Sequence, residues 1–169
     1  MTSHATMPPQ IAAVHADASA ERLFFSQYRL SMAGYCSRDT DYWDWAFEVL
    51  LRFVDPESAT ILHTKFHIFT RTLKEWARKE IQWRFSACRC LCPDEFLVLR
   101  LIAASQRNDK ETERRAAADL LGRADVEALL AASRSLAQEL QIREFVLAPI
   151  ERLAIVANPL PVPHSYTLQ

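Results

Sequence analysis

The sequence predicts an all-α, single-domain bundle of about five to six helices, built on an antiparallel helical hairpin and followed by an extended C-terminal tail. Gly34 and Gly122 are the only glycines in 169 residues, so the chain has few of the turn signals that a β-containing fold needs. Apolar residues recur at the three- and four-residue spacing of a helix face. A chain of this length buries enough surface for one core without disulfides or metals.

The two ends of the chain are expected to lie outside the bundle. Residues 1–18 have neither the basic start nor the apolar run of a secretory signal, and we expect them to form a disordered lead-in. The bundle is expected over residues 19–157. Residues 158–169 contain three prolines and are expected to form a flexible tail. No uninterrupted apolar run of about 18 residues predicts a membrane span, so a cytoplasmic protein is expected by default.

The hairpin is predicted at residues 39–85, after a first helix over residues 20–32 that Gly34 is expected to end. Asp55 and Pro56 divide the hairpin, because proline disfavours helical geometry in the residue before it and suits the first turn of a new helix. Each arm carries an apolar stripe at helical spacing. The stripes are Trp43, Ala46, Phe47, Leu50 and Val54 in the first arm, and Leu62, Phe66, Phe69, Leu73 and Trp76 in the second.

Three further helices are expected after the hairpin. Pro93 suits the first turn of a helix over residues 93–107, Asp109 is a candidate N-cap for the next helix, and Gly122 is a candidate C-terminal stop for it. A last long helix is expected over residues 125–142. The residues that we expect to be buried in the common core are Leu50, Phe66, Phe69, Leu73, Leu99 and Leu129.

The first arm of the hairpin has more apolar side chains than one contact face needs. Beyond the stripe, it carries Tyr42, Trp45, Val49 and Phe53. A helix that is apolar on more than one side is either fully internal or part of an interface, and aromatic residues are the usual anchors of interfaces. Tyr42 and Trp45 are therefore predicted to contact a protein partner or a second copy of the chain, unless other parts of the chain cover them.

The second arm is basic on the side opposite its stripe, at Arg71, Lys74 and Arg78. Residues 61–89 hold seven basic and two acidic side chains, although the whole chain has a net charge of −1. A solvated face that is partly paired with acidic neighbours explains this pattern, and a partner-binding face is the alternative. Residues 117–134 loosely resemble a helix-turn-helix, but the second helix there begins with acidic residues. The sequence therefore argues against nucleic acid as a partner.

Cys88, Cys90 and Cys92 occupy alternate positions in a connecting segment, and Cys36 lies far upstream. The Cys-x-Cys spacing is not the two-residue spacing of usual structural zinc sites, so reduced thiols are the first interpretation. Three thiols near basic side chains also suit a redox-sensitive cluster. With Cys36 they offer the alternative of a four-cysteine zinc site.

His63 and His67 are one helical turn apart, which is a spacing that can chelate a metal. Folding the hairpin at residues 55–56 places Glu48 opposite His63 and Asp44 opposite His67. These four side chains are a candidate zinc or iron site, although the Glu-x-x-His signature of di-iron bundles is absent. An exposed face of histidine and carboxylate ion pairs is the alternative interpretation.

No glycine-rich phosphate loop and no nucleophile motif occurs, so an enzyme is not expected. The chain has a general likeness to small helical bacterial proteins, which implies no function. The sequence favours a non-enzymatic interaction or regulatory module, or a subunit of a larger assembly, without a cofactor. The alternative is a metal- or redox-responsive helical protein that uses the cysteine cluster or the two histidines.

Overall fold

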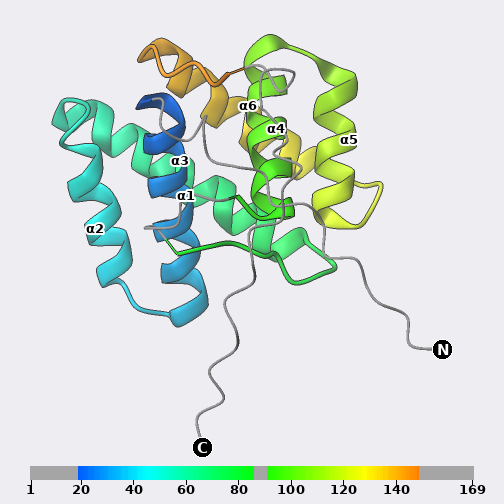
Figure 1. Ribbon diagram of the computed structural model, residues 1–169, viewed down its shortest axis with the longest axis horizontal. Helices are drawn as coiled ribbons and strands as arrows, with labels where there is room; N and C mark the ends of the chain where they lie inside the picture. Colours follow the sequence, from blue (N-terminus) through cyan, green and yellow to red (C-terminus); the bar gives the residue numbers. More distant parts are fainter. Residues whose placement is uncertain (1–18, 86–90, 149–169) are drawn as a thin grey trace, which may run out of the picture.

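The computed structural model describes residues 19–85 and 91–148, which form six helices and no strand (Figure 1). The all-α prediction is confirmed. The expected lead-in over residues 1–18 and the expected tail over residues 158–169 lie outside the described residues. The helices are α1 (Ser19–Ser37), α2 (Asp41–Leu50), α3 (Pro56–Trp76), α4 (Pro93–Arg107), α5 (Lys110–Leu121) and α6 (Glu127–Ile142).

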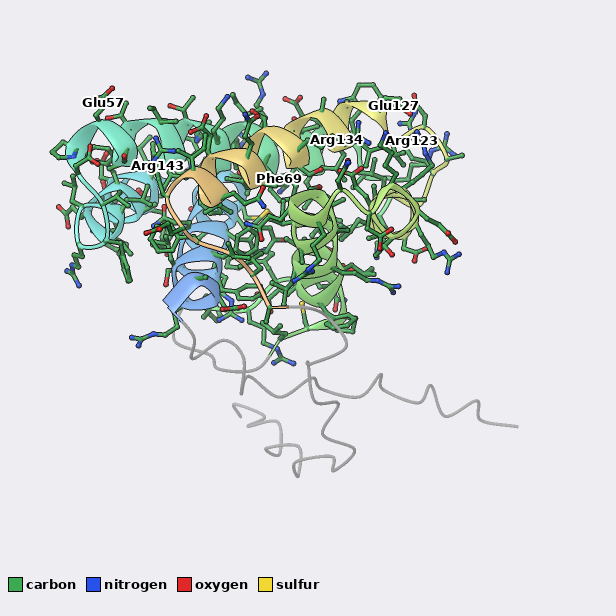
Figure 2. All side chains as sticks on the ribbon, turned by 90° about the horizontal axis from the view of Figure 1, so that it is seen from above. Glu57, Phe69, Arg123, Glu127, Arg134 and Arg143 are labelled. Atoms are coloured by element: carbon green, nitrogen blue, oxygen red, sulfur yellow. The ribbon has the colours of Figure 1, made fainter. Side chains whose placement is uncertain are left out.

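The helices pack in two groups that share one core. Helix α1 packs against α2 and α3, and α4 packs against α5 and α6. Contact between α3 and α6 joins the groups, and α6 runs across the molecule in Figure 2. Phe69 lies near the middle of that view, whereas Glu57 and Glu127 lie near its opposite ends. The six residues predicted for the core, Leu50, Phe66, Phe69, Leu73, Leu99 and Leu129, are all buried.

Helix α1 is longer than expected, because Gly34 does not end it. The helix continues to Ser37, and Arg38 then leaves it with a left-handed φ of 59°. Gly34 is buried inside the helix, where a Cβ atom would overlap the indole ring of Trp43. The glycine therefore provides close approach between α1 and α2, and the prediction that it stops the helix was wrong.

The second arm of the hairpin is shorter than expected. Helix α3 ends at Trp76 instead of Phe85, and residues 77–85 form no helix. Hydrogen bonds to distant residues satisfy part of the backbone of this segment. Arg78 N donates to the carbonyl oxygen of Leu121, and Gln82 N donates to an Asp94 carboxylate oxygen. The first arm is also shorter, because α2 ends at Leu50 and turns follow as far as residue 53.

Most helix ends follow the local signals in the sequence. The Asp55 carboxylate accepts a hydrogen bond from Ser58 N with Pro56 in the first turn of α3, and Pro93 begins α4. Asp109 caps α5, and Gly122 ends that helix at a φ of 63°. The last helix begins at Glu127, two residues later than expected.

The described part of the C-terminal segment runs without helix across the ends of α4 and α1. Gln106 makes two hydrogen bonds to this segment: its Nε2 donates to the carbonyl oxygen of Phe145, and its Oε1 accepts from Leu147 N. Ala148 N donates to the carboxylate of the buried Glu21 at 2.6 Å. The segment after α6 thus packs on the bundle as far as residue 148.

Candidate partner-binding surface

Helix α2 is held to the bundle by one of its sides. Ala46 and Leu50 are fully buried there, and Trp43 and Phe47 are partly buried beside them. Gln27 of α1 donates from Nε2 to the Ala46 carbonyl oxygen at 2.9 Å. This side accounts for the apolar stripe predicted for the first arm, so the remaining apolar residues of α2 are not needed for that contact.

Those remaining residues form what we call the α2 aromatic surface: Tyr42, Trp45, Val49 and Phe53. They share one side of α2 and its following turn by helical spacing. Trp45 is 52% exposed and Phe53 is 42% exposed, while Tyr42 and Val49 are partly exposed. The Tyr42 and Trp45 rings meet edge to face at 5.2 Å. The described residues therefore leave about half of the Trp45 side chain uncovered.

Acidic side chains adjoin this surface on the outward side of α2. Asp41, Asp44 and Glu48 are all exposed. Within the described residues, none of the three makes an ion pair. Their charges are thus available to a partner, and the local field favours a basic one.

The predicted histidines lie on the other side of α2, inside a cluster of aromatic rings. The His67 ring lies 4.7 Å from Trp43 and 5.0 Å from Tyr35, measured between ring centroids. The His63 ring lies 5.6 Å from Phe47 and 6.2 Å from His67. Burial lowers the pKa of both histidines, with smaller contributions from His67 to His63 and from Arg71 to His67. Asp44 raises the pKa of His63 and only partly offsets burial.

The structure does not assemble the candidate metal site. The two histidines lie among aromatic rings, whereas Asp44 and Glu48 are exposed. No group of three or more His, Cys, Asp or Glu side chains in residues 19–85 and 91–148 is placed to hold a metal ion. Of the four predicted ligands, His63 and His67 are the pair that the structure brings together, with their ring centroids 6.2 Å apart.

The cysteines fall into different environments. Cys88 and Cys90 lie outside the described residues. Cys92 is buried at the start of α4, where its Sγ donates to the Gln82 carbonyl oxygen at 3.2 Å, and burial raises the pKa of its thiol to about 11. Cys36 is exposed near the end of α1. Cys92 therefore acts as a packed and capping residue rather than a reactive one.

The basic residues of the second arm are exposed, but they do not form one helical face. Arg71 and Lys74 lie on α3, whereas Arg78 lies beyond its end. Arg71 Nε is paired with Glu75 at 2.7 Å. Because Arg71 is paired with Glu75 and Arg78 lies beyond the end of α3, these basic residues do not form the continuous basic face expected from the sequence.

One polar site in the structure was not predicted from the sequence. The Arg29 guanidinium and the Glu95 carboxylate form two hydrogen bonds, of 2.7 and 3.0 Å, and both side chains are buried. Glu95 also accepts from Arg84 N and Cys92 N, so it joins α1, the segment after α3 and the start of α4. Glu95 three residues after Cys92 was the available signal, because a carboxylate at the third position of a helix can accept from the backbone N–H of the N-cap residue.

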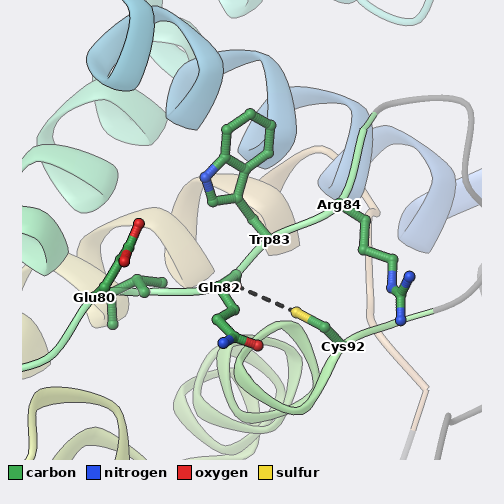
Figure 3. A pocket seen from close by; sticks show the side chains of 6 residues that line it. Glu80, Gln82, Trp83, Arg84 and Cys92 are labelled. Carbon is green, nitrogen blue, oxygen red and sulfur yellow. Dashed lines mark hydrogen bonds between the residues drawn. The ribbon is translucent and has the colours of Figure 1, made fainter. Parts of the chain in front are cut away.

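A shallow pocket lies beside this polar site (Figure 3). Its volume is about 410 Å³, and its lining comes mainly from the segment after α3. The Arg84 guanidinium extends beside Cys92 in that view. The sequence did not predict the pocket because this segment was assigned to a helix. The lining residues are Glu80, Ile81, Gln82, Trp83, Arg84 and Cys92.

Searches of protein-family models, curated proteins and solved structures found no match to the chain. None of the helices in the described ranges combines the length and apolar character needed to cross a membrane. Function is therefore inferred from the side chains and their surroundings.

Proposed function

We propose that the protein is a non-enzymatic binding module that holds a protein partner through the α2 aromatic surface. The single observation that carries this proposal is the half-exposed indole of Trp45, next to Tyr42 on a helix that is already anchored to the bundle through a different side. Tryptophan and tyrosine bury a large area at a small cost in side-chain entropy, which is why they dominate the binding energy of many interfaces.

The chemistry around the surface specifies the partner. Asp41, Asp44 and Glu48 adjoin the apolar side chains and make no ion pair within the described parts of the chain. A partner segment that combines apolar side chains with lysine or arginine would satisfy both parts of the surface. Nucleic acid would instead be repelled by these carboxylates.

A random peptide library displayed on phage tests this proposal directly. We expect peptides selected on the wild-type protein to combine aromatic or aliphatic residues with lysine or arginine. Their binding should weaken at least tenfold in Trp45→Ala and should fall as salt is added, because the attraction between charges is screened. Ile68→Ala is the matched control, since Ile68 is also about half exposed but lies on α3.

Two results would contradict the proposal. One is equal selection of peptides by the wild-type protein and Trp45→Ala. The other is selection of peptides without basic residues. Sedimentation at increasing protein concentration tests whether a second copy of the chain binds the α2 aromatic surface. A wild-type dimer that Trp45→Ala abolishes would show that the partner is another copy of the chain instead of a different protein.

A further inference from the structure

The structure brings one exposed thiol against one amine from a different helix. Cys36 lies near the end of α1 and Lys74 lies in the last turn of α3. Lys74 Nζ donates to Cys36 Sγ at 3.2 Å, although the residues are 38 positions apart in the chain. Packing of α1 against α3 therefore holds a nucleophile beside an oxidisable sulfur.

The amine has few competing interactions. Glu75, the acidic residue next to Lys74, forms an ion pair with Arg71 at 2.7 Å. Elsewhere in α3 and the segment after it, Lys79 is paired with Asp94 at 2.6 Å. Among the described residues, Lys74 makes no ion pair, and its hydrogen bond to the Cys36 thiol remains.

The two described thiols differ in accessibility. Cys36 is exposed, whereas Cys92 is buried and donates its proton to the Gln82 carbonyl oxygen. Peroxides oxidise thiols that they can reach, and the first product, a sulfenic acid, condenses with a nearby nitrogen. Cys36 alone of these two has both access and a neighbouring amine.

We propose that Cys36 and Lys74 form a covalent cross-link when the protein meets a peroxide. Hydrogen peroxide first converts the Cys36 thiol to a sulfenic acid and releases one water. The neutral Lys74 amine then attacks Sγ, so that an S–N bond forms and the S–O bond breaks. The departing hydroxide takes one amine proton and leaves as a second water. The protein loses two hydrogens in total, and one peroxide is reduced to two waters.

The cross-link joins the end of α1 covalently to the end of α3, so that α2 lies within the closed loop of chain. A covalent link of this kind restricts the unfolded chain, so the cross-linked protein unfolds at a higher urea concentration than the reduced protein. A thiol reductant cleaves the S–N bond and restores both side chains. The site is independent of the α2 aromatic surface and of any partner bound there.

Peptide mapping of the peroxide-treated full chain tests the inference. Because the linked lysine resists trypsin, we expect residues 30–38 and residues 72–78 to appear as one species, with a mass two hydrogens below the sum of the two peptides. Dithiothreitol should separate them. Cys36→Ser and Lys74→Arg should abolish this species, and Lys65→Arg should retain it because Lys65 has no thiol partner among the described residues.

The inference is overturned if wild-type Cys36 is recovered only as a sulfinic or sulfonic acid, or in a disulfide with another cysteine. It is also overturned if the linked species persists in Lys74→Arg. Far-ultraviolet circular dichroism of each variant confirms that it is folded, so that a lost cross-link is assigned to the missing side chain.

Discussion

Gly34 lies inside α1, where the absence of a side chain leaves room for the Trp43 indole. The indole also approaches the His67 ring at 4.7 Å, and Trp43 Nε1 donates to the Ser31 carbonyl oxygen at 3.5 Å. A single missing Cβ atom therefore decides how closely α1 and α2 approach each other. The same residue in a freely exposed helix would only lower its stability.

Gly34→Ala is expected to destabilise the protein although alanine is the better helix former. The gain in helix propensity is about 1 kcal/mol, and the overlap with Trp43 should exceed it, at a cost of about 1 to 3 kcal/mol. Urea unfolding measures the net effect. In a Trp43→Ala background the overlap is removed, so Gly34→Ala should become stabilising. Equal effects in both backgrounds would contradict the packing role of the glycine.

Glu95 is the residue at which three parts of the chain meet, and Glu95→Gln should cost about 3 to 5 kcal/mol of the free energy of unfolding. The substitution keeps the shape of the side chain but removes the charge that faces the buried Arg29 guanidinium. Urea denaturation measures the loss. Glu111→Gln is the control, because its ion pair with Arg115 is exposed. Similar losses in the two variants would disprove the stabilising role of the buried carboxylate.

At the scale of elements, the contact of α1, α2 and α3 encloses two histidines of lowered pKa. His67 lies against Tyr35 of α1 and Trp43 of α2, and His63 lies against Phe47 of α2. Burial is the main cause of the lowered pKa in both cases. The packing of α3 against its neighbours thus favours neutral imidazole rings.

This contact should weaken in mild acid. The ordinary histidine pKa is 6.5, and the folded protein has lower values, so the unfolded chain binds protons first as the pH falls. The contribution of the two neutral histidines to the free energy of unfolding is therefore complete above about pH 6.5. It is lost as the pH decreases toward the folded pKa values. Urea unfolding at pH 7.5 and pH 5.5 measures the difference. It should become smaller in His67→Phe, which keeps a ring between Tyr35 and Trp43 without a titrating group; an unchanged difference would exclude His67 as its source.

At the scale of the whole molecule, the contact between α3 and α6 unites the two groups of helices in one core. Phe66 and Phe69 are fully buried in that core, and the Phe66 ring lies 5.5 Å from Phe24 of α1. Because α3 and α6 belong to different groups and both contribute buried side chains to this core, the groups are expected to unfold together.

Phe69→Ala should therefore lower the free energy of unfolding of the whole molecule by about 3 to 5 kcal/mol, because it leaves a cavity in the core. Urea midpoints followed by tryptophan fluorescence and by circular dichroism should shift together. Ile68→Ala is the matched control, since the preceding residue is about half exposed. An unchanged midpoint for Phe69→Ala would mean that the core does not depend on this side chain.

Local signals in the sequence were sufficient for several features of the fold. The spacing of Leu62, Phe66, Phe69 and Leu73 identified the buried face of α3, since helix periodicity depends only on neighbouring residues. Asp55, Asp109 and Gly122 marked helix ends for the same reason, because capping acts within a few residues. The excess of apolar residues on α2 left two alternatives for Trp45, an interface or the interior, and the structure leaves this side chain 52% exposed among the described residues.

Short-range patterns in the chain were enough to establish the helical class, the core faces and most caps, whereas packing between distant residues sets where α1 and α3 end and which side chains meet. Gly34 remains helical because Trp43 fills the space beside it, and the segment after α3 leaves the helix because Glu95 and Asp94 accept its backbone N–H groups. Cys36 and Lys74 likewise meet only through packing. These contacts join residues that are distant in the chain, so no pattern within one helix contains them.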